Sequence, residues 1–318
     1  MRRYEMLLVS ALLVVAVLGV TLGVTSFQAH RAAEASIRHA LSNARRVVTD
    51  YLAARTRTLA TVSAVSAEVS EFRERLLTSR EREDVLDQAA EYRDLIGAAW
   101  VLVTDREGLL LARTDYPEEY DVDVSRGALV ADALAGKQTS GAFIDDRDTA
   151  AVKLYLAVAV PLAARGAAPQ GVLVAAYALD DSLATTIKRV TNTDVVFFAL
   201  RGDSVSRPIV VGGTLPAADI AVVLSDGLRV DSLGADTAGI HMSARVHDRD
   251  VIGLAAPIYS AGGDVFGGFL TLRSREEELG AFRVVRRTML FAIAGMVLLA
   301  LAAAAVVARR RRPFTSSS

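Results

Sequence analysis

The longest uninterrupted helical pattern in the sequence runs from about Glu34 to Thr78. Arg55 and Thr58 interrupt its apolar seam midway, and no Gly or Pro occurs anywhere in residues 25–96. This pattern predicts a rod of about 45 residues, roughly 65 Å long, which covers the chain's own sheet and uses part of its seam for dimerisation. The seam has the alternating three-and-four spacing of a coiled coil, and its apolar members are Ile37, Leu41, Ala44, Val48, Tyr51, Val62, Val65, Val69, Phe72 and Leu76.

Two apolar runs lie near the ends of the chain. Met6–Phe27 follows Arg2 and Arg3, and Thr288–Ala308 precedes four consecutive arginines at 309–312. Each run is long enough to cross the hydrocarbon core of a bilayer. A cleavable signal peptide would have a shorter apolar region and a small-residue cleavage site, so the first run is interpreted as a membrane span. The basic clusters predict cytoplasmic termini and an extracytoplasmic region between the spans.

Composition excludes several classes of function. The net charge of −1 gives no global basic field for nucleic acid, and the lack of cysteine excludes disulfides and thiolate chemistry. The acidic run Asp145–Asp148 lacks the glycine and distal glutamate of an EF-hand, so it is interpreted as a solvated loop. No nucleophile elbow or plausible Ser/His/Asp grouping occurs. We therefore predict neither an enzyme, nor a metal site, nor a cofactor.

Strand and turn signals between the apolar runs occur twice in a similar order. Pro161 and Gly171 lie ten residues apart near the end of the first series, and Pro257 and Gly267 repeat that spacing in the second. The repetition predicts two copies of one supersecondary unit. The first series has predicted strands at 96–104, 109–114, 139–144, 152–161 and 171–177 and a helix at 125–134. The second has predicted strands at 194–200, 208–211, 228–233, 241–246, 251–258 and 266–272 and a helix at 216–224.

With this architecture, the chain resembles the double Cache sensor region of bacterial transmembrane receptors. The segments that carry the likeness are Leu102–Arg113 (LVTDREGLLLAR) and Ala178–Leu183 (ALDDSL). The resemblance implies an α+β fold: two tandem PAS-like modules with antiparallel sheets on a long N-terminal helix, flanked by two transmembrane helices. It also implies a ligand in the membrane-distal module, a signal that passes through the second span, and a two-pass protein of the bacterial inner membrane.

The resemblance divides the chain into nine segments. They are a cytoplasmic N-terminus (1–5), transmembrane helix 1 (6–27), a long helical stalk (28–94), a membrane-distal Cache module (95–178), a connecting helix (179–192), a membrane-proximal Cache module (193–274), a juxtamembrane helix (275–287), transmembrane helix 2 (288–308) and a cytoplasmic basic tail (309–318). Only six residues follow Arg312. The output domain is therefore expected in a separate signalling partner, unless the chain is a truncated receptor.

The ligand site is predicted on one face of the strand at 152–161. There, small alanines beside Lys153 and Tyr155 leave room for a ligand, whereas the aliphatic face suits the long helix. Arg113 or Lys153 is expected to pair with a ligand carboxylate, and the tyrosines to pack on the ligand and hydrogen-bond to it. The predicted ligand-binding residues are Arg113, Tyr116, Tyr120, Lys153, Tyr155 and Tyr177.

An alternative function belongs to a different class. Polysaccharide chain-length regulators also place an extracytoplasmic domain between two terminal spans, but they are expected to carry their long helices mid-domain and to form large rings. Here the long helix comes first, which favours a sensor. Its expected partners are a small molecule, the lipid bilayer, a second copy bound through the N-terminal helix and a separate signalling partner, with no nucleic acid.

Overall fold

The chain forms two compact units. One comprises Met1–His39 with Ser274–Ser318, and the other comprises Ala40–Arg273. In the first unit, Arg275 forms an ion pair with Glu34. The second unit contains both β-sheets. The computed structural model describes residues 2–78, 81–148, 152–201, 208–227, 239–246 and 249–275, and the single positions 233, 288, 291, 294 and 295.

Several predicted segments lie outside the described residues. The second predicted span (288–308) has only four described positions, and most side chains of the first (6–27) are not described. The predicted strand at 228–233 and the juxtamembrane helix at 275–287 are also almost wholly outside. Within the part of the chain that is described, no helix has both the length and the apolarity to cross a membrane.

Three helices open the chain where one long helix was expected to reach Thr78. They are α1 (Arg2–Glu68), α2 (Ser70–Thr78) and α3 (Arg82–Ile96). The prediction of an unbroken helix is wrong because α1 ends at Glu68. There the Arg73 guanidinium donates to the carbonyl oxygens of Ala67 (3.2 Å) and Glu68 (3.4 Å), so it satisfies acceptors that the helix end leaves unbonded. Gly97 ends α3 at φ 63°, a conformation that glycine adopts without steric cost.

Two five-stranded antiparallel sheets follow, in the α+β arrangement expected. The strand order is β2-β1-β5-β4-β3 in the first sheet and β7-β6-β10-β9-β8 in the second, so the two sheets have the same topology. The first sheet consists of β1 (Trp100–Asp105), β2 (Leu110–Arg113), β3 (Thr139–Asp145), β4 (Lys153–Pro161) and β5 (Gly171–Ala178). The second consists of β6 (Asp194–Ala199), β7 (Ile209–Gly213), β8 (Ile240–Val246), β9 (Arg249–Tyr259) and β10 (Val265–Ser274). Three helices accompany them, α4 (Ala128–Leu134), α5 (Asp181–Thr191) and α6 (Ala217–Gly227).

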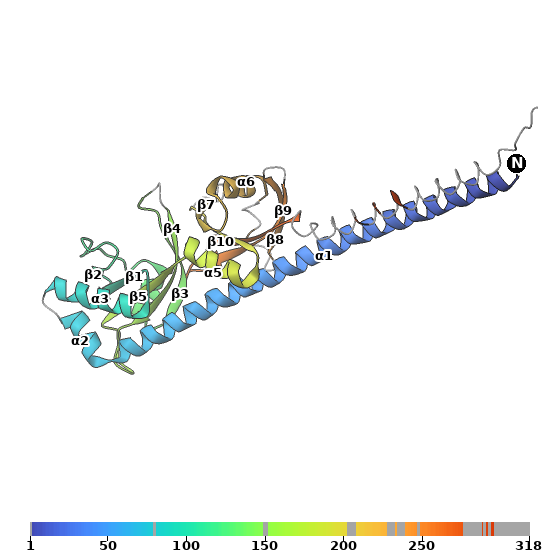
Figure 1. Ribbon diagram of the computed structural model, residues 1–318. Helices are drawn as coiled ribbons and strands as arrows, with labels where there is room; N and C mark the ends of the chain where they lie inside the picture. Colours follow the sequence, from blue (N-terminus) through green and yellow to red (C-terminus); the bar gives the residue numbers. More distant parts are fainter. Residues whose placement is uncertain are drawn as a thin grey trace, which may run out of the picture. The chain divides into compact units, whose positions relative to one another are not determined.

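Within the second unit, the part of α1 from residue 40 to 68 lies alongside both sheets (Figure 1). Val48 and Leu52 are buried in an apolar cluster with Phe197 of the second sheet. About two helical turns after Leu52, Leu59 joins the cluster that includes Val101 of the first sheet. The helix therefore forms part of the core of both halves, as expected for an amphipathic helix with one wide apolar face.

Three valines of the predicted seam, at the end of α1 and directly after it, face solvent, although Leu76 at the end of the seam is fully buried. Val62, Val65 and Val69 are 39%, 62% and 49% exposed, whereas Ile37 and Leu41 at the beginning of the seam are fully buried. One heptad pattern therefore contributes side chains both to the interior of the protein and to its surface. The side chains at its start pack within the chain, and the valines near the end of α1 form an apolar strip on the surface.

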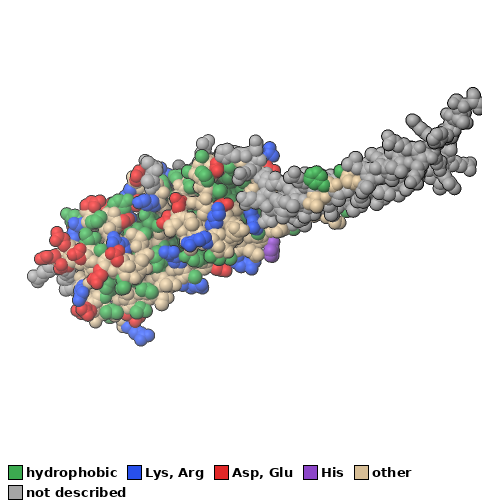
Figure 2. Space-filling view, viewed as in Figure 1, with side chains coloured by type: hydrophobic (Ala, Val, Ile, Leu, Met, Phe, Trp, Pro, Cys, Tyr) green, Lys and Arg blue, Asp and Glu red, His purple; other side chains and the backbone are tan. Residues whose placement is uncertain are grey.

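Acidic side chains gather at the end of the second unit that contains α2 and α3 (Figure 2). A cleft of about 540 Å³ lies there, and its lining includes Glu74, Asp87 and Glu91. Arg75, which also lines the cleft, forms an ion pair with Glu71 at 2.7 Å. This end of the molecule therefore attracts cations more than anions.

Candidate functional site

The candidate site lies on the face of the first sheet that α4 covers. Three aromatic side chains line this face: Trp100 at the start of β1, Phe143 on β3 and Tyr155 on β4, which is the cross-strand partner of Phe143. Strand alternation sends these side chains to the same side, because successive residues of a strand point to opposite faces. Charged residues from the ends of β2 and β3 surround the aromatic group. We call this combined set the distal site. Its members are Trp100, Arg113, Asp115, Tyr116, Glu119, Phe143, Asp145, Arg147 and Tyr155.

Arg113 is held at the edge of the distal site by a buried ion pair. Its side chain is only 8% exposed, and Nε and Nη2 donate to the two carboxylate oxygens of Asp115 at 2.8 and 3.0 Å. The guanidinium carbon lies 5.1 Å from the ring centres of both Trp100 and Tyr116. Two-point pairing and contact with aromatic rings compensate part of the cost of burying the charge.

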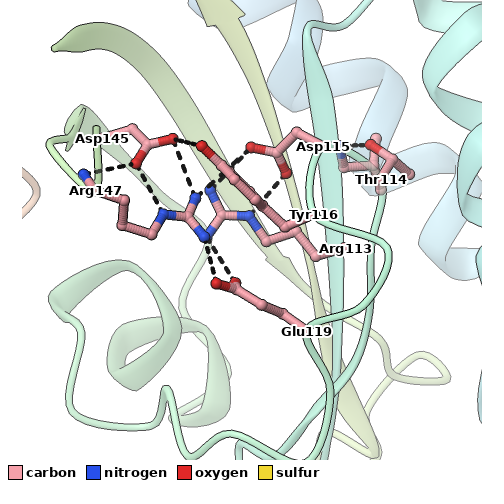
Figure 3. Close-up of polar contacts among 8 residues, drawn as sticks. Arg113, Thr114, Asp115, Tyr116, Glu119, Asp145 and Arg147 are labelled. Atoms are coloured by element: carbon pink, nitrogen blue, oxygen red, sulfur yellow. Dashed lines mark hydrogen bonds and ion pairs between the residues drawn. The ribbon is translucent and has the colours of Figure 1, made fainter. Parts of the chain in front are cut away.

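Arg147 joins the two loops of the site (Figure 3). Its Nε donates to Asp145 at 2.9 Å, its Nη1 donates to Glu119 at 2.6 Å, and its guanidinium carbon lies 3.3 Å from the ring centre of Tyr116. Tyr116 in turn donates its hydroxyl to Asp145 at 2.9 Å. The loop after β2 and the loop after β3 are therefore held together by a continuous network of charged hydrogen bonds.

The network shifts the protonation equilibria of its members. Burial opposes ionisation of Asp145, but hydrogen bonds from Arg147 and Tyr116 hold the pKa of this carboxyl below its ordinary value. The hydrogen bond to Asp145 raises the pKa of Tyr116. Burial, reinforced by the nearby carboxylates of Asp115 and Asp145, raises the pKa of Tyr155 to about 12. At neutral pH Asp145 is therefore charged, and the phenols of Tyr116 and Tyr155 are neutral.

Trp100 carries the clearest unsatisfied group of the site. The residue is 1% exposed, and its indole Nε1 has no hydrogen-bond partner among the described residues. Its ring packs edge-on against Phe143 and Tyr155, with centroids 5.3 and 5.6 Å away. Because an unsatisfied buried donor costs about 1–3 kcal/mol, this N–H would gain from an acceptor atom supplied by a ligand.

The structure brings together half of the six predicted residues. Arg113, Tyr116 and Tyr155 lie in the distal site, whereas Lys153 is exposed at the start of β4, opposite Asp145 in register. Tyr120 is 50% exposed, and the Arg82 guanidinium carbon lies 4.1 Å from its ring centre.

Tyr177 lies on the opposite face of the sheet. The register between β4 and β5 pairs Tyr177 with Leu156, on the aliphatic face of β4. Its hydroxyl donates to the carbonyl oxygen of Ile96 at 3.1 Å. The sequence could not place this residue, because a shift of one residue in register exchanges the two faces of a strand.

Six residues of the distal site were not among those predicted: Trp100, Asp115, Glu119, Phe143, Asp145 and Arg147. The acidic run containing Asp145 had been interpreted as a solvated loop, but Asp145 is 5% exposed and bonded to both Tyr116 and Arg147. The sequence did contain a signal for these residues. The charged run Asp145–Asp148 directly follows the predicted strand at 139–144, which carries the aromatic residue Phe143. In the described part of the chain, no three His, Asp or Glu side chains are grouped so that they could hold a metal ion.

Comparisons by sequence find no relative: no family model matches the chain, and no curated protein matches it. Solved structures do resemble it. The extracellular domain of the putative histidine kinase vpHK1S-Z8 has a TM-score of 0.51 at 10% identity, covering 80% of this chain and 95% of that one.

Two further structures are similar at lower scores. The ligand-binding domain of the Campylobacter jejuni chemoreceptor Tlp3, in complex with L-norvaline, has a TM-score of 0.45 at 14% identity and covers 79% of this chain and 94% of its own. The sensor domain of the V. cholerae histidine kinase DctB has a TM-score of 0.43 at 14% identity and covers 74% and 98%. At these identities the likeness concerns the fold alone. In its fold, the chain resembles the extracellular domain of the putative histidine kinase vpHK1S-Z8, and it contains two antiparallel five-stranded sheets with the same strand order.

Proposed function

We propose that this protein is a membrane-anchored extracytoplasmic sensor, which binds a small ligand in the distal site and transmits a conformational signal across the membrane. The observation that carries this proposal is the buried N–H of Trp100, which lies among aromatic rings and fixed charges and has no acceptor within the described residues. A mostly apolar surface with a few convergent polar groups is typical of small-molecule sites. No catalytic role is proposed.

The ligand of the distal site is expected to carry a carboxylate. Arg113 uses Nε and Nη2 on Asp115, but its Nη1 lies 3.9 Å from the nearest oxygen of Glu119, beyond hydrogen-bond length. Nη1 of Arg113 and Nε1 of Trp100 are therefore two donors of the site without a short hydrogen bond, and the guanidinium carbon lies 5.1 Å from the centre of the Trp100 ring. A carboxylate could accept from both of them.

Strand β3 provides a route by which occupancy could reach the second sheet. Its Phe143 side chain lies in the distal site, whereas Ala142 on the other face packs in the cluster with Phe269 and Ile258 of the second sheet. Ala142 also forms a parallel bridge with Ser260.

Glycine is required next to this bridge, because a Cβ at Gly141 would lie 2.1 Å from the backbone nitrogen of Ala261. Immediately after β3, Asp146 pairs with Arg201, which follows β6, at 3.2 Å. We propose that a shift of Arg147 on ligand binding moves this neighbouring ion pair.

A homodimer through α1 is part of the proposal. The exposed strip formed by Val62, Val65 and Val69 supports it, since a second copy would remove three valines from water. The alternative of a structural two-span protein, similar to the polysaccharide chain-length regulators, predicts a high-order ring instead. The native mass of the chain in detergent distinguishes a dimer from a ring.

Ligand binding is tested by titrating the full chain in detergent with a library of small carboxylates, using calorimetry. Trp100→Phe keeps the ring but removes the donor, so we expect about tenfold weaker binding with little loss of stability. Phe198→Leu is the control: Phe198 is fully buried in the second sheet, so this variant should lose stability and keep its affinity. Equal affinity in wild type, Trp100→Phe and Arg113→Ala would exclude the distal site.

A further inference from the structure

A second cavity lies on the other side of the first sheet from the distal site. Its volume is about 210 Å³, smaller than the roughly 300–1,000 Å³ of sites for drug-sized ligands, and suited to a small metabolite. Four parts of the second unit line it and leave one side open to solvent: α1, the turn that follows α3, the end of β5 and the first turns of α5. We call it the junction cavity.

Arg55 forms the basic wall of the junction cavity. This is the residue that interrupts the apolar seam of the long helix. Its guanidinium carbon lies 4.2 Å from the ring centre of Tyr177, and its Nη1 makes one long hydrogen bond, 3.4 Å, to the hydroxyl of Tyr51. Among the described residues no carboxylate pairs with Arg55. Most of its five donors are therefore available to an acceptor inside the cavity.

Asp180, an exposed residue, supplies a carboxylate to the lining of the same cavity. It is the N-cap of α5, and its Oδ1 accepts from the backbone N–H of Leu183 at 2.9 Å. No described donor bonds its second oxygen. The cavity lining therefore carries both a cation and an anion. This arrangement favours a ligand that carries an acceptor group at one end and a donor at the other.

We propose that the junction cavity is a second ligand site, for a compact carboxylate that also carries a hydroxyl or amino donor. The carboxylate pairs with Arg55, and the donor bonds to Asp180. The bound molecule links α1 to α5, and α5 precedes the second sheet directly. Occupancy of this cavity therefore stiffens the connection between the long helix and the second half, independently of the distal site.

The test uses three probes of nearly equal size: L-lactate, L-alanine and propionate, which lacks the donor. Each is titrated by calorimetry into the full chain in detergent micelles. Wild-type protein should bind L-lactate or L-alanine at least tenfold more tightly than propionate. Binding of neither donor-bearing probe, or equal binding of all three, overturns the proposal.

Four variants locate the binding. Arg55→Gln should weaken binding at least tenfold, whereas Arg57→Gln, an exposed arginine on the same helix, should leave it unchanged. Asp180→Asn keeps a good N-cap residue and should remove the advantage of L-alanine over propionate, so this variant serves even where Arg55→Gln fails to fold. Trp100→Phe should bind these probes like wild type, which separates this cavity from the distal site. Wild-type affinity in Arg55→Gln or Asp180→Asn, or loss of binding in Trp100→Phe, contradicts the assignment.

Discussion

The first strand of each sheet makes the same reciprocal pair of hydrogen bonds, between a valine and a threonine. In the first, the N–H of Val101 donates to the hydroxyl of Thr114 at 2.9 Å, and the Thr114 N–H donates back to the Val101 carbonyl at 3.0 Å. In the second, Val195 and Thr214 make the same two bonds at 3.1 and 3.0 Å. A register shift follows two residues later in both sheets, after Val103 in the pairing of β1 with β2 and after Phe197 in the pairing of β6 with β7.

The side chains next to this valine–threonine pair differ completely between the two sheets. The position before the threonine is Arg113 in the first sheet and Gly213 in the second, and the position before the valine is Trp100 in the first and Asp194 in the second. A Cβ at Gly213 would lie 2.9 Å from Ile220 of α6, so the second half has no space for an arginine there. The backbone is therefore duplicated, whereas the charged and aromatic site exists in one copy.

The largest effect is expected when the arginine is placed in the second half. Gly213→Arg should lower the free energy of unfolding by about 3 kcal/mol, because a side chain at this position overpacks against Ile220 and Val196. Gly262→Arg is the matched control at an exposed turn with space for a side chain, and it should cost less than about 0.5 kcal/mol. Chemical denaturation measures both, and equal stabilities would show that the two halves tolerate the same residue.

The two threonines test whether the corresponding hydrogen bonds of the two sheets contribute equally to stability. Thr114→Val leaves the buried Val101 N–H without its acceptor, which should cost about 1–2 kcal/mol. Thr214→Val should cost about 1 kcal/mol more, because the Thr214 hydroxyl also bonds to Asp194 at 2.6 Å. Denaturant midpoints at constant slope give both values. A larger loss of stability for Thr114→Val would mean that the valine–threonine pairs of the two sheets are not equivalent.

Tyr155 should give the first half a pH dependence at alkaline pH. Its position corresponds to Val251 in the second sheet, and burial raises its pKa to about 12. The unfolded phenol ionises near pH 10, so the folded form keeps its proton longer and stability falls as the pH rises through this window, by about 1 kcal/mol between about pH 9 and 11. Stability measured across that range should fall less steeply in Tyr155→Phe than in wild type. Identical slopes would contradict the shift.

The smallest effect is expected at Asp194, the counterpart of Trp100. Its partner Lys188 is 43% exposed in the side chain, so Lys188→Ala should cost only about 0.5 kcal/mol and less at high salt. Thermal unfolding at two ionic strengths measures this. A loss comparable to that of Thr214→Val would show that the second half also depends on its charged residues.

Pattern and turn chemistry predicted most of the fold. Alternation located nine of the ten strands of the described sheets to within a few residues, and the paired Pro161/Gly171 and Pro257/Gly267 spacings predicted the duplication. The first strand was predicted to begin at Ile96, but α3 extends to that residue and β1 begins at Trp100. The end of α1 at Glu68 was not predicted, because neither glycine nor proline marks it. The structure shows there the Arg73 guanidinium donating to the carbonyl oxygens of Ala67 and Glu68.

The duplicated α+β architecture follows from local sequence patterns, because side-chain period and turn residues act along short stretches of the chain. Which charged residues meet depends instead on tertiary contacts. Strand register placed Tyr177 on the face opposite Tyr155, and the approach of two loops paired Arg147 with Glu119. Such contacts join residues distant in sequence, and their energies depend on burial and geometry that exist only after the sheets have formed.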